Sequence, residues 1–211
     1  MPELLEVYDL KGKLLGTEER QEFYRKSSEE FGKNGRVSRK LKTITLLLMN
    51  SQGRIYLQKR SNAKPQNPGL FDKTVGGHVS KGSNWNVTAI KECAEELGFP
   101  AAVLPEKEFQ EAIKTVDLTV IGILRQVARE KISLSLRKTE RGEFTQAYDD
   151  CFYLGYYDGY IKFKDGEATG IQTYSLKELE AEMQLRSLDF TEDLKSMVKK
   201  YRKLLVPLNS L

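Results

Sequence analysis

Three glutamates, Glu92, Glu95 and Glu96, have the types and spacing that most directly suggest chemistry. On a helix, positions i, i+3 and i+4 project from the same side of one turn. Like charges at this spacing destabilise a helix by roughly 0.2–0.5 kcal/mol per pair, and the helix dipole disfavours acids near the C-terminal end. A hard divalent cation would relieve the repulsion, and carboxylate oxygens are ligands that Mg²⁺ and Mn²⁺ prefer. The alternative interpretation is an ordinary solvated acidic face.

The segment before the glutamates, residues 74–82, contains the adjacent glycines Gly76 and Gly77. Glycines let the backbone approach an ion closely, and a carbonyl there could join the carboxylates as a metal ligand. A strand, a glycine loop and an acidic helix in this order could together hold a metal-bound diphosphate.

The helix that positions the glutamates is predicted over residues 84–97. Ser83 or Asn84 can cap its first turn, and Gly98 can end it. Apolar residues three or four positions apart predict one buried stripe on the face opposite the glutamates, made of Val87, Ile90, Ala94 and Leu97.

The rest of the chain predicts a mixed β-sheet with helices on its faces, a fold of class α+β. The clearest signal is a hairpin formed by 41–49 and 54–58. The other predicted elements are strands within 118–136 and over 146–157, 160–163 and 171–174, a polar loop at 138–144, and helices over 105–114, 175–183 and 191–205. A hairpin, a helix capped by Thr17 and ended by Gly32, and a linker would form an N-terminal extension (1–38) of a single domain, 1–211, whose core is 39–211.

Composition excludes several classes of protein. The chain has 211 residues, a formal net charge of +4, two cysteines and one histidine, His78. These counts exclude a disulfide framework, a zinc site and any multi-histidine metal site. Without an apolar run of about 18–20 residues or a visible secretory signal, we expect a cytoplasmic protein with reduced thiols and no membrane partner. The basic stretches at 36–42 and 199–203 are interpreted as solvated faces, so nucleic acid is disfavoured as a partner.

Residues 77–99 resemble the signature of the Nudix hydrolases. That signature is Gly, five residues, Glu, seven residues, Arg-Glu, an apolar residue, any residue, Glu-Glu, any residue, Gly and an apolar residue. The positions that match in register are Gly77, Glu92, Cys93, Glu95, Glu96, Gly98 and Phe99. Ser83 stands in place of the first Glu, and Lys91 stands in place of the Arg.

The resemblance implies an α/β/α sandwich with a Nudix-like mixed sheet. It also implies metal-dependent hydrolysis, with Mg²⁺ or Mn²⁺, of the diphosphate bond in a nucleoside diphosphate linked to another group. Glu92 and Glu96 would be metal ligands, Glu95 a ligand or the base that activates water, and Gly76 or Gly77 a carbonyl donor. Lys91 keeps the charge of the family's Arg but loses its bidentate fork. Because Lys91 and Ser83 depart from the signature, a weakened module that binds a nucleotide or phosphorylated ligand for regulation stays open as an alternative.

The segment from Gln58 to Asp72 is similar to the isopentenyl-diphosphate isomerase branch of the same superfamily. That resemblance implies that Arg60 and Lys64 bind diphosphate, with two ordinary surface cations as the alternative. Isomerase activity itself is disfavoured, because Gly76 stands where that enzyme has a cysteine and only His78 matches its several metal-binding histidines. His78 is either a pocket residue or a structural loop histidine.

Family hydrolases often add a carboxylate from outside the signature. The candidates are Glu143, Asp149, Asp150 and Glu167. Glu143, in the predicted polar loop, and Glu167, just before a late strand, are put forward as the possible extra base, and the sequence does not choose between them. We expect a small phosphorylated substrate and, by analogy with the family, a homodimer.

Overall fold

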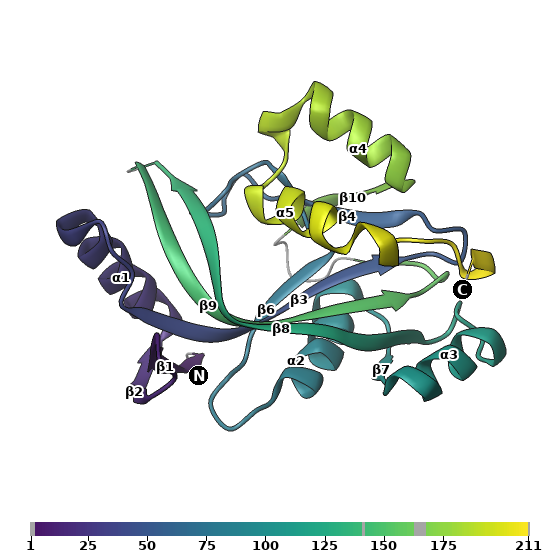
Figure 1. The fold of residues 1–211 in the computed structure, drawn as a ribbon, viewed down its shortest axis with the longest axis horizontal. Coiled ribbons are helices and arrows are strands. Elements are labelled where there is room, and N and C mark those ends of the chain that lie inside the picture. The colour runs from purple at the N-terminus through teal and green to yellow at the C-terminus, as the bar shows by residue number, and fades with distance from the viewer. Residues whose placement is uncertain (1–2, 141, 163–167, 211) are drawn as a thin grey trace.

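The computed structural model describes residues 3–140, 142–162 and 168–210. Its centre is a mixed sheet with the strand order β10-β4-β3-β9-β8-β7, onto which β1, β2, β5 and β6 add (Figure 1). The strands are β1 (Leu4–Asp9), β2 (Leu14–Glu19), β3 (Arg39–Met49), β4 (Ile55–Arg60), β5 (Phe71–Asp72), β6 (Val75–His78), β7 (Ala101–Val103), β8 (Gly122–Thr139), β9 (Gly142–Tyr156) and β10 (Ala168–Tyr174). The α-helices are α1 (Arg20–Asn34), α2 (Trp85–Glu92), α3 (Glu106–Thr115), α4 (Leu176–Leu185) and α5 (Glu192–Tyr201).

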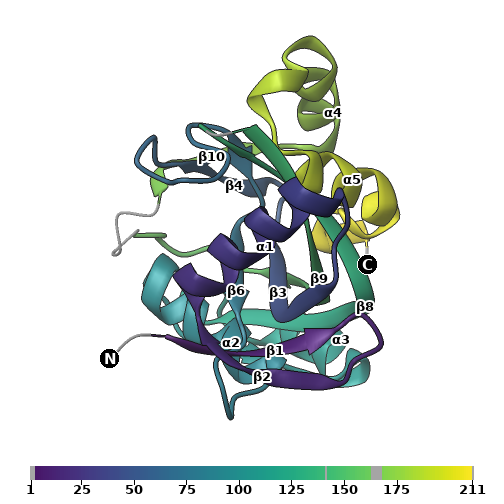
Figure 2. The same ribbon diagram turned by 90° about the vertical axis from the view of Figure 1, so that its left-hand side faces the viewer.

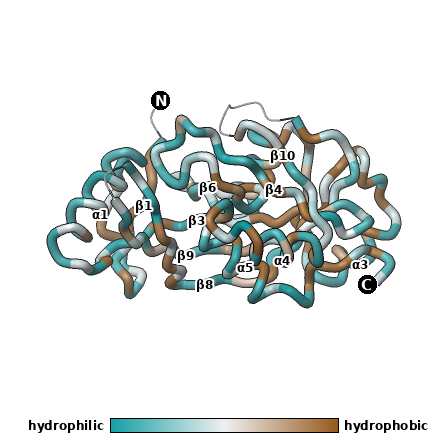
Figure 3. Tube along the Cα trace, turned by 90° about the horizontal axis from the view of Figure 1, so that it is seen from above, coloured by the Kyte–Doolittle hydropathy of each residue, from teal (hydrophilic) through white to brown (hydrophobic). Residues whose placement is uncertain are grey.

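Both faces of the sheet are covered, which confirms the α+β class with helices on either side. Successive strand residues point to opposite faces. Ile44, Leu46 and Leu48 of β3 therefore pack in one core with α2, whereas Leu47 and Met49 pack in a second core with α4 and α5. Figure 3 shows hydrophobic segments along the central strands and mostly hydrophilic ones over α1.

The sheet splits beside β3, and this split positions the site. β3 pairs with β6 from Thr43 to Leu46, but with β4 only at Leu48 and Met49. Beyond that point β5 pairs with β4 in place of β3, while β10 pairs along the other edge of β4 from Ile55 to Arg60. β4 and β6 therefore diverge, and an opening forms between them at one end of the sheet.

β8 and β9 form a long antiparallel hairpin that continues past the core, and this corrects the loop predicted at 138–144. The register runs as far as Lys138 opposite Glu143 and Thr139 opposite Gly142. The residues are polar because the end of the hairpin is largely exposed. They are nevertheless extended, because β8 and β9 pair with each other up to the turn. The predicted short strand at 160–163 is also wrong as far as the structure describes it, because 160–162 are irregular.

The N-terminal extension packs against β3 and β9. Phe23 of α1 is fully buried and forms a small core with Leu5, Val7, Leu41 and Tyr148. In Figure 2, α1 crosses in front of β6, β3 and β9. The extension therefore stands directly over the opening in the sheet.

The ends of α1 differ from the prediction. Thr17 pairs with Glu6 in the β1–β2 ladder, so it is a strand residue rather than the helix cap. The helix continues past Gly32 to Gly35, which has a left-handed φ of 61° and donates its N–H to the Phe31 carbonyl at 2.7 Å. That backbone bond ends the helix, and the left-handed conformation explains the glycine.

The two glycines should therefore respond in opposite directions to alanine. We expect Gly32→Ala to raise the free energy of unfolding by about 0.5–1 kcal/mol, because it removes a helix-interior glycine whose Cβ would meet open space. We expect Gly35→Ala to lower it by about 1–2 kcal/mol, because alanine must adopt the left-handed conformation. Urea unfolding of both variants checks this. Changes of the same sign in the free energy of unfolding would contradict a helix end at Gly35.

α2 presents a different face to the sheet from the one predicted. Asn84 caps it, accepting a hydrogen bond from the Val87 N–H at 3.0 Å, and Gly98 ends the segment with a φ of 81°. The predicted stripe is wrong: Val87, Ile90 and Ala94 are exposed. The small residues Thr88 and Ala89 lie against the sheet instead, where they allow a close approach of the helix.

The basic stretch at 36–42 does not form an exposed patch. The Lys40 side chain is buried and donates to the carbonyls of Leu10 and Lys131, and Arg39 pairs with Glu18. Throughout the part of the chain that the structure describes, no helix combines the length and the apolar character needed to cross a membrane.

Candidate functional site

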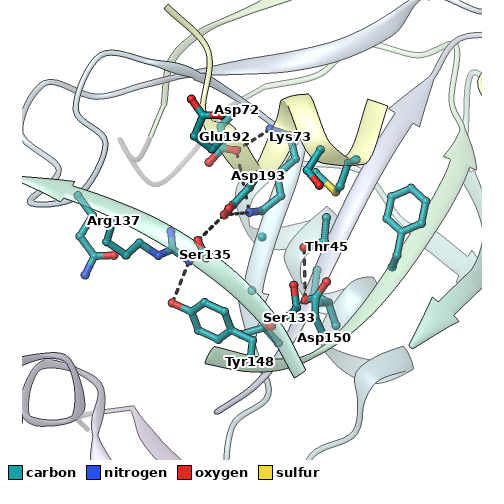
Figure 4. Close-up of a pocket in the computed structure, with 18 of the residues that line it drawn as sticks. Thr45, Asp72, Lys73, Ser133, Ser135, Arg137, Tyr148, Asp150, Glu192 and Asp193 are labelled. Atoms are coloured by element: carbon teal, nitrogen blue, oxygen red, sulfur yellow. Dashed lines mark hydrogen bonds and ion pairs between the residues drawn. The ribbon is translucent and has the colours of Figure 1, made fainter. Parts of the chain in front are cut away.

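A cavity of about 420 Å³ opens at the split between β4 and β6. Its walls come from both sides of the split, from the β8–β9 hairpin and from α5 (Figure 4), and also from α1. Of the residues proposed from the sequence, those that line it are Arg60, Lys64, Gly76, Gly77, His78, Glu96 and Asp150, whereas Glu92 is not part of the lining.

Glu92 and Glu96 form an acidic pair against Gly77. A Cβ on Gly77 would lie 2.3 Å from Glu92 Oε1, so only glycine leaves room for this carboxylate. Burial raises the pKa of Glu92 to about 7; the nearby Glu95 charge adds to this, whereas a hydrogen bond with Glu96 opposes it. Burial makes the ionised form of a carboxyl group costly, so Glu92 holds its proton more readily than a surface glutamate does. The segment Cys93–Leu97 is a π-helix, an irregularity that is frequent at functional sites.

Glu95 points away from this pair. Its side chain is 59% exposed and forms an ion pair of 3.5 Å with Lys91 one turn earlier, and it does not line the cavity. The expectation that the three glutamates meet at one point is therefore met by two of them. The π-helix contributes to the difference, because it changes the angle between successive side chains from that of the α-helix assumed in the prediction.

Asp150 supplies a carboxylate from outside the signature. It lines the cavity and accepts hydrogen bonds from Thr43 Oγ1 at 2.7 Å and Thr45 Oγ1 at 3.3 Å, both from the neighbouring strand β3. Burial raises the pKa of Asp150 to about 6, against the opposing effect of these hydrogen bonds. Asp150 is therefore a base that is ionised at neutral pH but holds a proton more readily than a surface aspartate.

The other outside carboxylates lie elsewhere. Asp149 points to the opposite face of the sheet, where Arg129 binds both its oxygens at 2.8 Å. Glu143 is exposed near the turn of the hairpin, 3.8 Å from Lys138, and is not part of the cavity lining. Glu167 lies outside the described residues.

Cations and carboxylates together line the rest of the cavity. The cations are Arg20 of α1, Arg60 of β4, Lys64 of the following loop, Lys73 between β5 and β6, Arg137 of β8 and Lys200 of α5, and the carboxylates are Asp72, Glu130, Glu192 and Asp193. Arg60 is fixed in place, since it donates to the Gln66 and Asn67 carbonyls and forms an ion pair of 3.2 Å with the buried Asp72. Lys73 and Lys200 also pair with lining carboxylates, Asp193 and Glu130, so these cations can contact an anionic group individually but do not form a large surplus of positive charge.

His78 belongs to a chain of hydrogen bonds that ties α1 to the sheet. Its Nε2 lies 2.8 Å from the Tyr24 hydroxyl, which lies 2.9 Å from the Tyr148 hydroxyl, and Arg137 donates to the latter at 2.8 Å. Burial lowers the pKa of His78 well below its usual value, and the charges of Arg20 and Arg137 add to this. His78 is therefore neutral at neutral pH.

Several cavity residues carry no signal in the sequence. Tyr24, Lys73, Arg137, Tyr148 and Asp193 are ordinary residues in their own elements, and only the fold brings them together. The spacing of acids and glycines in the sequence predicted only the wall that contains Glu96 and Gly77. The charged residues of the other walls come from elements far apart in the chain, so no local pattern predicted them.

A divalent cation fits the acidic wall in its donor chemistry. Buried carboxylate oxygens and a backbone carbonyl are hard donors, and a bound cation would replace the proton that Glu92 holds. In the part of the chain that the structure describes, no three His, Cys, Asp or Glu side chains are grouped closely enough to enclose a metal. The acidic wall thus provides two carboxylates, and water or ligand oxygens would fill the remaining coordination positions of a cation.

Comparison with known proteins agrees with this architecture. The model of the NUDIX domain family matches residues 39–194. Over 61 residues, 29% of the chain and 36% of the relative, the sequence is 41% identical to an uncharacterized Nudix hydrolase of Pseudomonas aeruginosa. Over 103 residues, 49% of the chain and 47% of the relative, it is 29% identical to the isopentenyl-diphosphate Delta-isomerase of Streptomyces griseus. These matches span less than two thirds of either relative.

Solved structures share the fold at low sequence identity. A Deinococcus radiodurans protein superposes with a TM-score of 0.63 and 17% identity, covering 94% of this chain and 98% of that one. A bifunctional NMN adenylyltransferase/ADP ribose pyrophosphatase of Francisella tularensis, complexed with AMP and a manganese ion, superposes with a TM-score of 0.52 and 14% identity over 88% of this chain and 47% of that one. With a family match over most of its length and the Nudix fold around the matched segment, the chain belongs to the NUDIX domain family.

Proposed function

We propose that this protein is a pyrophosphohydrolase that cleaves the diphosphate bond of a nucleoside diphosphate linked to another group, or of a related small molecule, with Mg²⁺ or Mn²⁺ as cofactor. The observation that carries the proposal is the acidic pair Glu92–Glu96 packed on Gly77, of which Glu96 lines a cavity that Arg60 and Lys64 also line. Such an arrangement would provide separate places for a metal and for phosphate charge.

Each wall has a part in this reaction. Glu92, Glu96 and a carbonyl of Gly76 or Gly77 would hold the cation, which supplies charge neutralisation at the phosphates and a lowered pKa for bound water. Asp150, with a pKa of about 6, is suited to accept the proton of the attacking water at neutral pH. Arg60 and Lys64 would bind the phosphate oxygens.

The other end of the cavity suits an organic group. Phe152 and Tyr201 stack there with ring centroids 4.1 Å apart, beside Met197. Apolar and aromatic surface of this kind could contact the base or the linked group of the substrate.

The direct test is turnover on a panel of nucleoside diphosphate derivatives, with and without Mg²⁺, beside a Glu96→Gln control. We expect hydrolysis of at least one member that depends on both the metal and Glu96. A folded protein that turns over none of them would overturn the proposal.

A second function, regulatory binding without hydrolysis, is favoured by one observation. Glu95 is exposed and paired with Lys91, so one of the family's three glutamates is turned away from the cavity. This alternative predicts that calorimetry detects binding of a nucleotide while the panel shows no turnover.

Magnesium should stabilise the protein more at high pH than at low pH. The folded-state pKa values of Glu92 (about 7) and Asp150 (about 6) are raised above the ordinary carboxyl values, so without metal the stability they confer falls as pH rises from about 4 to 7. Metal binding requires the ionised carboxylates, so it is strongest above that window. At a Mg²⁺ concentration about 100 times the Kd at pH 8, we expect a Tm increase of about 5–10 °C at pH 8. The same concentration should give a much smaller increase at pH 5.5.

Thermal melts at the two pH values, with and without Mg²⁺, measure this difference. Glu96→Gln serves as the control, because it removes one ionisable member of the pair. An equal Tm shift at both pH values, or one that persists in the control, would place the metal elsewhere.

A further inference from the structure

Lys73 is a cation that neither the signature nor the isomerase-like segment includes. It follows β5 directly and extends through the cavity wall, and its side chain is only 11% exposed (Figure 4). The stem passes over Gly76, where a Cβ would lie 2.5 Å from Lys73 Cε. The absence of a side chain at Gly76 is therefore what gives Lys73 its path.

The ammonium of Lys73 is held by charge and not by hydrogen bonds to its carboxylate neighbours. It lies 3.9 Å from Asp193 Oδ2 and 4.0 Å from Asp72 Oδ1, both beyond hydrogen-bond distance. Asp72 is already occupied, since it pairs with Arg60 and accepts a hydrogen bond from Thr191 at 2.8 Å. Asp193, the second residue of α5, accepts one from Ser135 Oγ at 2.6 Å.

Lys73 also stands between the acidic wall and the basic walls. Its charge acts on Asp150 and on His78. It opposes the increase in the pKa of Asp150 that burial causes, and it adds to the decrease in the pKa of His78. A lysine kept only for stability would be expected to hydrogen-bond its counter-ions or to extend into water. This one is partly desolvated and faces the cavity.

We propose that Lys73 binds the substrate directly, its ammonium donating to an oxygen of a substrate phosphate, and that Asp193 holds it over Gly76 until the substrate arrives. The proposal rests on the proposed function in assuming that the cavity takes a diphosphate. Asp193 is then a positioning residue that competes with the phosphate for the same ammonium. The two residues should consequently affect binding in opposite directions.

The experiment measures binding of inorganic pyrophosphate by calorimetry in the presence of a chelator, so that no metal takes part. Loss of a hydrogen bond between charged groups costs about tenfold or more in affinity, and we expect that loss for Lys73→Met. We expect Lys73→Arg to retain most of the affinity, Asp193→Asn to bind as tightly as the unaltered protein or more tightly, and the exposed α5 variant Lys199→Met to show no change.

Gly76→Ala provides a second, independent variant. The added Cβ meets the far end of a flexible side chain, and Gly76 has no positive φ, so the protein should fold with Lys73 displaced. We expect weaker pyrophosphate binding in the otherwise unaltered protein and no further loss when Lys73→Met is already present.

Unchanged affinity in Lys73→Met overturns the proposal, as does equal weakening by Lys73→Met and Asp193→Asn, which indicates a purely structural ion pair. The proposed function fails separately. Lys73-dependent pyrophosphate binding without turnover of any substrate would overturn hydrolysis and leave this inference standing, whereas turnover with Lys73-independent binding would do the reverse.

Discussion

Glu96→Gln is expected to lower kcat/KM on a diphosphate substrate by about 10²- to 10³-fold, the range seen when one electrostatic contact to a developing charge is removed. Glu96 is the signature glutamate that lines the cavity, and its carboxyl group hydrogen-bonds with the buried Glu92. Glutamine keeps the size of the side chain and removes its charge. Steady-state kinetics with saturating Mg²⁺ measures the loss.

Stability separates this effect from misfolding. The amide that Glu96→Gln introduces can donate a hydrogen bond to ionised Glu92, so without metal the variant should melt at the same temperature as the unaltered protein at pH 8, or higher. It should lose most of the stabilisation by Mg²⁺. A variant that melts much lower without metal would show that Glu96 is needed for the fold itself.

Glu95→Gln is the matched comparison. Its carboxylate is exposed and lies next to Lys91, and surface ion pairs of this kind contribute about 0–1 kcal/mol. We expect the loss in kcat/KM to stay below about tenfold, in line with that energy. Equal losses in Glu95→Gln and Glu96→Gln would mean that Glu95 turns into the cavity when metal and substrate bind.

The elements with strong local signals could be predicted from sequence. The hairpin of β3 and β4, the helix cap at Asn84 and the starts of the helices at 175 and 191 all depend on residues close together in the chain. The errors have two different causes. The end of the β8–β9 hairpin pairs residues that are close in the chain, but its polar composition is typical of a loop. The buried face of α2 is set by distant partners, because Thr88 and Ala89 are the residues that approach the sheet.

The candidate site also has one part that the sequence located and one part that it did not. The Nudix-like segment located the acidic wall because its residues lie within one strand–loop–helix unit. The basic walls come from Arg20, Lys73 and Arg137 on separate elements, and no spacing in the sequence relates them. Asp150 was one of four candidate carboxylates, and only its register opposite Thr43 distinguishes it from Asp149, which points to the other face of the sheet.

The adjacent glycines of β6, Gly76 and Gly77, leave room for different side chains on the two faces of the strand. Adjacent strand residues point to opposite faces. At Gly76 a side chain would meet Lys73, and at Gly77 it would meet Glu92. The pair therefore leaves room for a cation on one side and for a carboxylate on the other.

Gly77→Ala is expected to abolish most Mg²⁺-dependent turnover while the fold persists. The new Cβ would lie 2.3 Å from Glu92 Oε1 and 2.7 Å from its Cγ and Cδ, so the carboxyl group must leave its position beside Glu96. Gly77 has no positive φ, and the cost of such overpacking is about 1–3 kcal/mol, which a stable domain tolerates. Kinetics and the Mg²⁺-dependent Tm shift should fall together.

Gly170→Ala in β10 is the matched control, because its added Cβ meets open space and it too lacks a positive φ. It should leave both measurements unchanged. A Glu92→Ser background removes the clash, so Gly77→Ala should add no further loss of Mg²⁺ response there. Normal turnover in Gly77→Ala alone would show that the position of Glu92 against this glycine is not part of the metal site, and the acidic pair would then have to be assigned a structural role.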